Sequence, residues 1–277
     1  MKLLWLFLSL IFIFSQHSYA QYRDSTKVKI QKETVYRIRP LIDGTIIAGG
    51  LVSNYFGIRI LKGKDGLDSA KVVTLSPDDV RPKWDRGAAR QDPDYAEKAM
   101  LLSDVYLYGS FLLSAGLLFD KKIRHEALSV GVVLLTTSSV MANAYSWGVG
   151  HINKYRPYVY NTKESIERRT RNGSRNSFYG GHAAAAAAAS FFIAKVYHDY
   201  NPGSKLTPYL FAGAIIPPTI VSYYRYKAGM HFPSDLIVGV AAGAGIGILI
   251  PQLHKRKSDK LTLLPSSNGI YISYQID

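Results

Sequence analysis

The chain has 277 residues, no cysteine, and 34 lysine and arginine residues against 20 aspartate and glutamate residues, a formal net charge of +14. The lack of cysteine excludes a disulfide framework and a cysteine-ligated metal site. The positive charge favours anionic partners. The sequence lacks a zinc-finger, basic-zipper or RNA-binding signature, so we expect a phosphorylated small molecule or an anionic membrane surface as partner, and no nucleic acid.

The first twenty residues have the layout of a secretory signal. A lysine precedes an apolar run over residues 3–14, and small residues stand at Ser18 and Ala20. We therefore predict a signal peptide over residues 1–20. The alternative is an uncleaved membrane anchor, although the run is shorter than the ~20 residues that a span requires. Residues 21–102 then form an N-terminal region that contains the first apolar helix.

Six apolar segments follow, bounded by glycine, proline and charged residues. Their length and their alanine, leucine and glycine content predict an all-α fold, a six-helix bundle. The third and fifth segments are long enough to cross a bilayer and the sixth is borderline, which leaves open an integral membrane protein and a soluble bundle with an apolar core. The segments cover residues 45–61, 105–119, 127–150, 183–194, 206–224 and 236–253.

Residues 254–277 begin with the basic stretch HKRK and continue with two short apolar runs on either side of Asn268 and Gly269. An Asn-Gly pair between two such runs is a strong turn signal. We expect a short C-terminal β-hairpin there and assign it no chemistry.

Charged residues stand at two junctions between the apolar segments. If successive helices run antiparallel, the junction between the third and fourth segments lies on the same face as the junction between the fifth and sixth. The first junction contains Arg156 and His182, and the second, YRYKAGMHFPSD, contains Arg225, His231 and Asp235. We therefore expect these five side chains to meet in one pocket.

The residue types in this pocket suit phosphoryl transfer. Gly180 and Gly181 permit a close backbone approach at a helix start, where free amides favour an anion. Asp235 can accept a hydrogen bond from one ring nitrogen of His231 and leave the other free to attack. Two arginines can hold a phosphoryl group, and His182 can protonate the leaving oxygen.

Each residue also has an ordinary structural interpretation. A histidine at a helix start is often a cap, an interhelical arginine often binds carbonyl groups, and the alanine run after His182 is typical of close helix packing. The occurrence of two histidines, two arginines and an aspartate at converging junctions favours a functional site.

The pattern resembles the three-part signature of the type-2 phosphatidic acid phosphatase superfamily, which includes lipid phosphatases, soluble bacterial acid phosphatases and vanadium haloperoxidases. The resemblance covers residues 103–250. It implies a six-helix bundle, with the catalytic helical bundle at residues 103–253, and hydrolysis of phosphate monoesters or diphosphates without metal or cofactor. The residues that carry it are R-P at 156–157, G-H at 181–182, and R-x5-H-x3-D at Arg225, His231 and Asp235.

The resemblance also implies roles for individual residues. His231 is expected to be the nucleophile that becomes phosphohistidine, Asp235 its orienting partner, and His182 the general acid. The expected phosphate ligands are Arg156, Arg225, Gly181 and Lys154.

Two positions depart from the family pattern. Val149 stands where the family has a lysine, for which Lys154 or His151 could substitute, and Gly180 stands where it has a serine. Each lost donor costs ~2–4 kcal/mol in the transition state. The leading hypothesis is a phosphatase that acts on a lipid-linked phosphate or a small phosphate ester. The alternatives are a degenerate, noncatalytic anion-binding envelope protein of the same fold and a metalloenzyme that uses both histidines.

Basic stretches predict the orientation in a bacterial cell envelope. DKKIRHE (120–126) and HKRK lie on the face opposite the pocket, so the positive-inside rule predicts a membrane-associated protein with a periplasm-facing site. A cleaved signal before six crossings contradicts this orientation, so we predict that the segment at 45–61 does not span. The alternative is a soluble periplasmic bundle.

The arginine-rich loop at 164–175 would attract a polyanionic headgroup. The sequence carries no signal for an oligomeric state.

Overall fold

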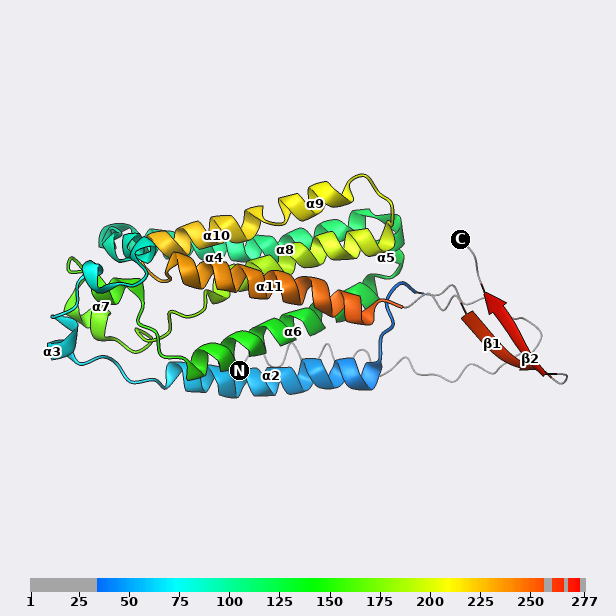
Figure 1. Ribbon diagram of the computed structural model, residues 1–277, viewed down its shortest axis with the longest axis horizontal. Helices are drawn as coiled ribbons and strands as arrows, with labels where there is room; N and C mark the ends of the chain where they lie inside the picture. Colours follow the sequence, from blue (N-terminus) through cyan, green and yellow to red (C-terminus); the bar gives the residue numbers. More distant parts are fainter. Residues whose placement is uncertain (1–33, 257–260, 267–268, 275–277) are drawn as a thin grey trace, which may run out of the picture. The chain divides into compact units, whose positions relative to one another are not determined.

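The computed structural model describes residues 34–256, 261–266 and 269–274, so the predicted signal peptide lies outside the described residues. Ten α-helices in these ranges confirm the all-α class (Figure 1). The helices are α2 (Pro40–Lys62), α3 (Ser69–Val72), α4 (Ala96–Leu112), α5 (Lys121–His125), α6 (Ala127–His151), α7 (Ile166–Thr170), α8 (Gly181–Tyr200), α9 (Thr207–Gly213), α10 (Ile216–Lys227) and α11 (Pro233–His254).

The predicted apolar segments correspond to the long helices α2, α4, α6, α8 and α11 and to the pair α9 and α10. The fifth segment is not one continuous helix. Pro217 and Pro218 lack amide hydrogens, so they fit the first turn of a new helix and cannot continue the preceding one. Further along, β1 (Leu261–Ser266) and β2 (Gly269–Tyr274) pair antiparallel at the position of the predicted hairpin, and Leu261 lies opposite Tyr274. Residues 267–268 of its turn lie outside the described residues.

Helices α8 and α11 are in backbone contact along most of their length. Gly239, Gly243 and Gly247 lie one turn apart on α11, where Gly239 faces the Gly180 backbone and the other two face Ala184 and Ala188 of α8. A Cβ atom on Gly243 would lie 1.9 Å from the Ala184 carbonyl oxygen, so no larger residue fits there. The alanine run therefore serves helix packing, as its ordinary interpretation predicts, and the packing brings the first turns of α8 and α11 together.

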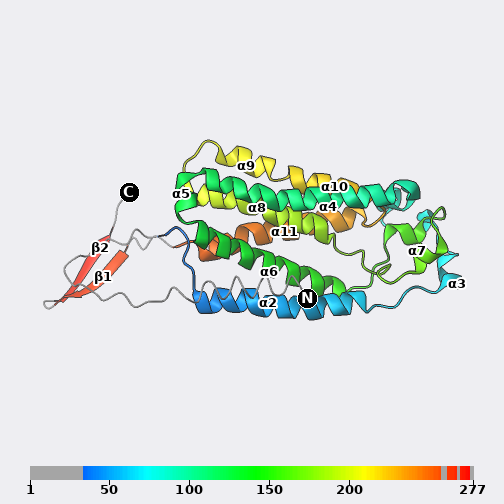
Figure 2. The ribbon, with the colours of Figure 1, turned by 180° about the vertical axis from the view of Figure 1, so that it is seen from behind.

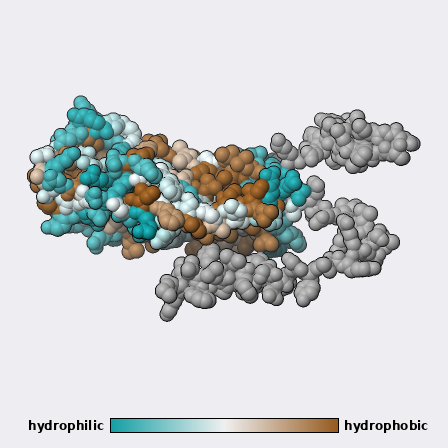
Figure 3. Space-filling view, turned by 90° about the horizontal axis from the view of Figure 1, so that it is seen from below, coloured by the Kyte–Doolittle hydropathy of each residue, from teal (hydrophilic) through white to brown (hydrophobic). Residues whose placement is uncertain are grey.

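The bundle has two ends that differ in structure. The loop end carries α3, α7 and the connection over residues 152–180, and the α5 end carries α5 and the start of α2 (Figures 1 and 2). Helix α2 runs from the α5 end to the loop end along α6. Figure 3 shows hydrophilic side chains gathered at the loop end and apolar side chains over the helices.

Within residues 34–256, four helical stretches are long and apolar enough to cross a membrane: α2, residues 93–119, α6 and α11. The first segment, which was predicted not to span, corresponds to α2, and its 23 residues make it a candidate span by length and composition. The fifth segment, predicted to be long enough, is not among the four, because it is divided into α9 and α10. Large apolar side chains lie on the outer faces, with Leu41 87% and Phe119 88% exposed.

At the α5 end, a buried carboxylate ties three parts of the chain together. Asp199 on α8 contacts the Lys195 ammonium one turn before it and the Lys255 ammonium at 2.7 Å. It also accepts a hydrogen bond of 2.9 Å from the Tyr36 hydroxyl. This cluster anchors the segment before α2 and the end of α11 to the bundle.

Candidate functional site

The two charged junctions meet at the loop end. The Tyr158 amide donates to the Gly229 carbonyl at 3.0 Å, and the Gly180 amide donates to the Asp235 carbonyl at 3.1 Å. The antiparallel arrangement predicted from the sequence therefore brings the residues that follow α6 against the residues that precede α11.

His231 is buried, with 1% of its surface exposed. Its Nδ1 donates to the Ser177 carbonyl at 2.6 Å, and because a carbonyl only accepts, this bond fixes the tautomer and leaves Nε2 with a lone pair. Burial, with the charges of Arg156 and Arg225, holds the pKa of His231 well below its usual value. The ring is therefore neutral at physiological pH, as a nucleophile must be.

Asp235 does not bind the His231 ring directly, contrary to the expectation. One carboxylate oxygen accepts from the Ser177 hydroxyl at 2.6 Å and from the Phe232 amide at 3.1 Å. The carboxylate is directed there because Asp235 lies in the first turn of α11, where it caps the amide just outside the helix. Asp235 thus acts on His231 through Ser177, which holds the carboxylate with its hydroxyl and the imidazole with its carbonyl.

Lys154, predicted to bind phosphate, is engaged by the same carboxylate. Its ammonium lies 2.6 Å from the Asp235 Oδ1 and 3.2 Å from the Ser234 hydroxyl. Ser234 in turn donates its amide and hydroxyl to Asp85, which is fully buried. The ammonium of Lys154 therefore forms an ion pair with Asp235. Asp85 holds the start of α11, and the sequence did not predict this role for Asp85.

Arg156 and Arg225 are buried, with 8% and 6% of their surfaces exposed. Arg156 donates to the carbonyls of Gly173 and Met230, and Arg225 contacts the Ser103 hydroxyl at 3.4 Å. Among the described residues, neither guanidinium pairs with a carboxylate, and the Arg225 Nε has no hydrogen-bond partner. Burial, together with the charge of Arg156, lowers the pKa of Arg225 to about 10.

Buried like charges of this kind are unfavourable unless an anion compensates them. The two guanidinium groups therefore leave positive charge uncompensated beside the His231 ring, an arrangement that suits an anion.

His182 lies in the first turn of α8, and its Nε2 is 3.0 Å from the Asp104 carboxylate of α4. Burial and the charge of Arg225 lower the pKa of His182 to about 4, and Asp104 acts in the opposite direction. Asp104 was not among the predicted site residues. Its sequence signal is an acidic residue inside the apolar run LLSDVYLYG.

The two glycines before His182 have different surroundings. The Gly180 amide is occupied by the Asp235 carbonyl, so it is not available to a ligand. Gly181 is the first residue of α8, and amides of a helix's first turn have no partner within the helix. A Cβ atom on Gly181 would lie 2.3 Å from the Tyr145 ring, so the glycine is required for this close approach.

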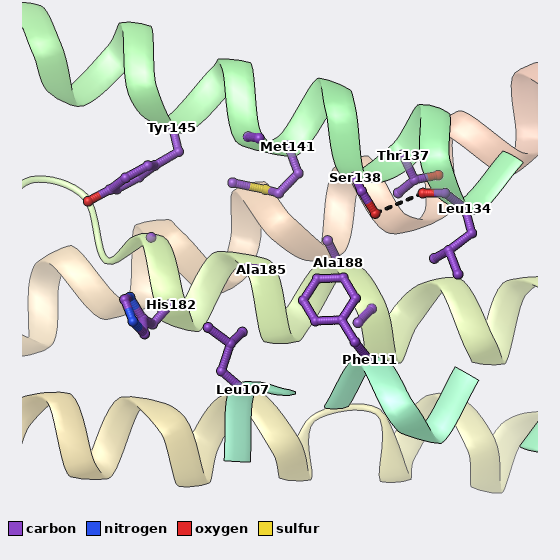
Figure 4. A pocket seen from close by; sticks show the side chains of 13 residues that line it. Leu107, Phe111, Leu134, Thr137, Ser138, Met141, Tyr145, His182, Ala185 and Ala188 are labelled. Atoms are coloured by element: carbon purple, nitrogen blue, oxygen red, sulfur yellow. Dashed lines mark hydrogen bonds between the residues drawn. The ribbon is translucent and has the colours of Figure 1, made fainter. Parts of the chain in front are cut away.

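An apolar groove of about 360 Å³ lies between α4, α6 and α8 and ends at Tyr145 and His182 (Figure 4). Its floor consists of small residues of α8 and its walls of larger apolar residues from α4 and α6. Its apolar lining includes Leu107, Phe111, Leu134, Met141, Ala185 and Ala188. The His182 ring and the apolar groove are therefore contiguous.

The arginines of the 164–175 loop serve different purposes. Arg168 pairs with Glu164, Arg169 donates to three carbonyl groups, and Arg175 donates to the carbonyls of Asp65 and Gly66. Arg171 instead lines a cavity of about 480 Å³, together with Lys62 and Arg156. Fewer arginines of this loop are therefore available to a polyanionic headgroup than the loop composition suggests. The part of the chain that the structure describes contains no group of three His, Asp or Glu side chains placed to hold a metal ion.

A comparison with protein-family models matches residues 126–259 to the PAP2 superfamily. The match covers α6 to α11 and therefore every predicted site residue. A search of curated proteins and a search of solved structures found no match to the chain.

Proposed function

Residues 126–259 form a PAP2 superfamily domain, and we propose that this domain is a phosphatase that hydrolyses lipid-linked phosphate monoesters or diphosphates through a phosphohistidine at His231. The observation that carries the proposal is the pair of buried guanidinium groups without a carboxylate partner in the described residues, beside a neutral histidine. A phosphoryl group supplies the missing negative charge and places its phosphorus atom within reach of the His231 Nε2.

The proposed reaction has two steps. In the first, the His231 Nε2 attacks phosphorus, the bond from phosphorus to the leaving oxygen breaks, and protonated His182 donates its proton to that oxygen. In the second, water attacks phosphohistidine, His182 takes the proton from the water, and phosphate leaves. Arg156 and Arg225 stabilise the charge on the phosphoryl oxygens throughout.

Binding of the substrate also prepares His182. Burial and the charge of Arg225 hold the pKa of His182 at about 4. A bound phosphate dianion offsets that charge, so it raises the pKa of His182 and favours the protonated form that the first step requires.

The surroundings of His182 support a lipid alcohol as leaving group. In an in-line displacement, the leaving oxygen lies on the side of phosphorus opposite the nucleophile, which is the side of the general acid. On that side, His182 opens onto the apolar groove. A hydrocarbon chain in this groove is removed from water, whereas a sugar or nucleotide would be poorly solvated there.

The test is phosphate release by the purified full-length protein in EDTA from phosphatidic acid, an isoprenyl diphosphate and an aryl phosphate. We expect EDTA-resistant release that is lost in His231→Ala and retained in His125→Ala, a control on α5 at the opposite end. If both wild type and His231→Ala are inactive on the whole panel while orthovanadate still binds, the noncatalytic alternative is correct.

The groove is tested separately by filling it. Ala185→Leu narrows the floor of the groove and is expected to slow phosphatidic acid hydrolysis at least tenfold while leaving aryl phosphate hydrolysis unchanged. Ala241→Leu on the exposed face of α11 is the matched control. Equal rates of phosphatidic acid hydrolysis in wild type and Ala185→Leu would exclude a chain-binding role for the groove.

We also propose that the site faces the periplasm, because α5 and the end of α11, which carry basic residues, lie at the opposite end. Since α2 runs between the two ends, this orientation places the start of α2 on the cytoplasmic side, which a signal cleaved near Ala20 would not do.

The cysteine-free chain permits a direct test. Asn172→Cys at the loop end should react with an impermeant maleimide in spheroplasts, and Lys205→Cys only after lysis. The reverse pattern places the site in the cytoplasm, and reaction of both before lysis indicates the soluble alternative.

A further inference from the structure

We infer that Tyr145 is a further ligand of the transferred phosphoryl group and donates its phenolic hydroxyl to a phosphoryl oxygen. The inference rests on the proposed function. It assigns a role in the reaction to a residue outside the three motifs, and it identifies a hydroxyl donor in a site where Gly180 provides none.

The position of Tyr145 is fixed by contacts at the start of α8. The residue belongs to α6, and its ring lies against Gly181, where a Cβ atom would approach the ring to within 2.3 Å. The ring also meets the Tyr179 ring edge-on, with 5.9 Å between centroids. Figure 4 shows Tyr145 and His182 at the same end of the apolar groove. The tyrosine therefore lies beside the first-turn amides of α8 and the general acid.

The electrostatic surroundings place the hydroxyl near both guanidinium groups. Burial lowers the pKa of Arg156 and of Arg225, and Tyr145 acts in the opposite direction on each of them. Tyr145 is therefore one of the residues that surround both guanidinium groups, at the place proposed for the phosphoryl group. The structure records no hydrogen bond of the Tyr145 hydroxyl within residues 34–256, so the donor is free for a ligand.

A phenol suits this position chemically. A phenolic hydroxyl keeps its proton at physiological pH, so it donates a hydrogen bond without adding charge. The two arginines already carry more positive charge than the described residues around them compensate, so a neutral donor completes the coordination of a phosphoryl oxygen without further repulsion. Hydrogen bonds to charged groups are stronger than those between neutral groups.

The test is Tyr145→Phe, which removes the oxygen and keeps the ring that packs on Gly181. We expect phosphate release to fall about 10- to 100-fold, the usual worth of a hydrogen bond to a charged group, to the same extent on phosphatidic acid and aryl phosphate. Orthovanadate affinity, measured by calorimetry, should fall similarly. Tyr106→Phe, on the exposed side of α4, is the matched control and should change neither quantity.

Two results would overturn the inference. Unchanged turnover and vanadate affinity in Tyr145→Phe would show that the hydroxyl does not contact the phosphoryl group. A loss confined to phosphatidic acid would show that Tyr145 acts only as a wall of the groove. If wild type binds vanadate but has no turnover, the phosphatase proposal fails while the vanadate affinities still decide the role of Tyr145.

Discussion

The two ends of the bundle both bury charge, but they treat it in opposite ways. At the α5 end, the buried Asp199 carboxylate is matched by two ammonium groups and a tyrosine hydroxyl. At the loop end, Arg156 and Arg225 are equally buried, and no carboxylate among the described residues neutralises them. The nearby carboxylates bind other groups, Asp235 the Lys154 ammonium and Asp104 the His182 ring, and they act on the two arginines without forming an ion pair with them.

This difference separates structural charge from functional charge. A buried ion pair that is complete within the protein fixes the arrangement of the chain, and removing one partner is costly. A buried charge left incomplete is unfavourable until a ligand of opposite sign arrives. We therefore expect substitutions at the α5 end to change stability and substitutions at the loop end to change binding and catalysis.

The largest expected effect is on stability. Asp199→Asn keeps the size of the side chain but leaves Lys195 and Lys255 without their counter-ion, so it should lower the free energy of unfolding by about 3 kcal/mol or more. The measurement is thermal or denaturant unfolding of the purified protein. The folded fraction should retain the turnover number of wild type, and a selective loss of turnover would contradict the division between the two ends.

The matching change at the loop end is Arg225→Leu. It removes a buried charge that has no acidic partner among the described residues, so stability should stay equal or increase. Phosphate release should fall about 10²- to 10³-fold, a loss of about 3–4 kcal/mol in transition-state stabilisation. Unfolding and activity are measured on one preparation, and a strongly destabilised but active variant would refute the assignment of Arg225.

An anionic ligand should compensate the charge of Arg156 and Arg225 at the loop end and so stabilise the protein, without affecting the ion pairs at the α5 end. Orthovanadate at about 100 times its dissociation constant should stabilise wild type by about 2.7 kcal/mol through mass action. Arg156→Gln should abolish this gain, whereas Asp199→Asn, although less stable, should show the full gain. Equal stabilisation of wild type and Arg156→Gln would place the anion elsewhere.

The helical segments and the meeting of the two junctions could be predicted from the sequence because both depend on pattern and chain direction. Apolar length marks the helices, and antiparallel neighbours bring alternate junctions to one end. The division of the fifth segment was missed although Pro217 and Pro218 mark it in the sequence. The apolar run at 45–61 is shorter than the helix that contains it, which starts at Pro40 and is long enough to be a candidate span, so the sequence pattern underestimated its length.

Contacts within the site were less predictable, because they depend on the rotation of each helix about its axis. Asp104, Asp85 and Tyr145 come from elements outside the three motifs, and only the packed bundle shows which way they face. The sequence does not show which acceptor binds the His231 Nδ1, because the Asp235 carboxylate and a backbone carbonyl are both able to accept its hydrogen bond. Ser177 takes the ring instead, and its place before the second motif did not indicate this.

The smallest expected effect concerns pH. In the proposed mechanism His182 carries a proton in the first step, and its pKa is about 4, so kcat/KM should fall as pH rises above this value. Asp104 raises the pKa of His182. Asp104→Asn should therefore move the falling limb of the profile to lower pH, and kcat/KM at a fixed higher pH should fall by about tenfold for every pH unit over which the limb moves.

The pH–rate profile with aryl phosphate measures this, with the exposed Asp78→Asn as control. Superimposable profiles for wild type and Asp104→Asn would mean that the carboxylate does not set the protonation of the general acid, and a limb displaced to higher pH would mean that another group donates the proton.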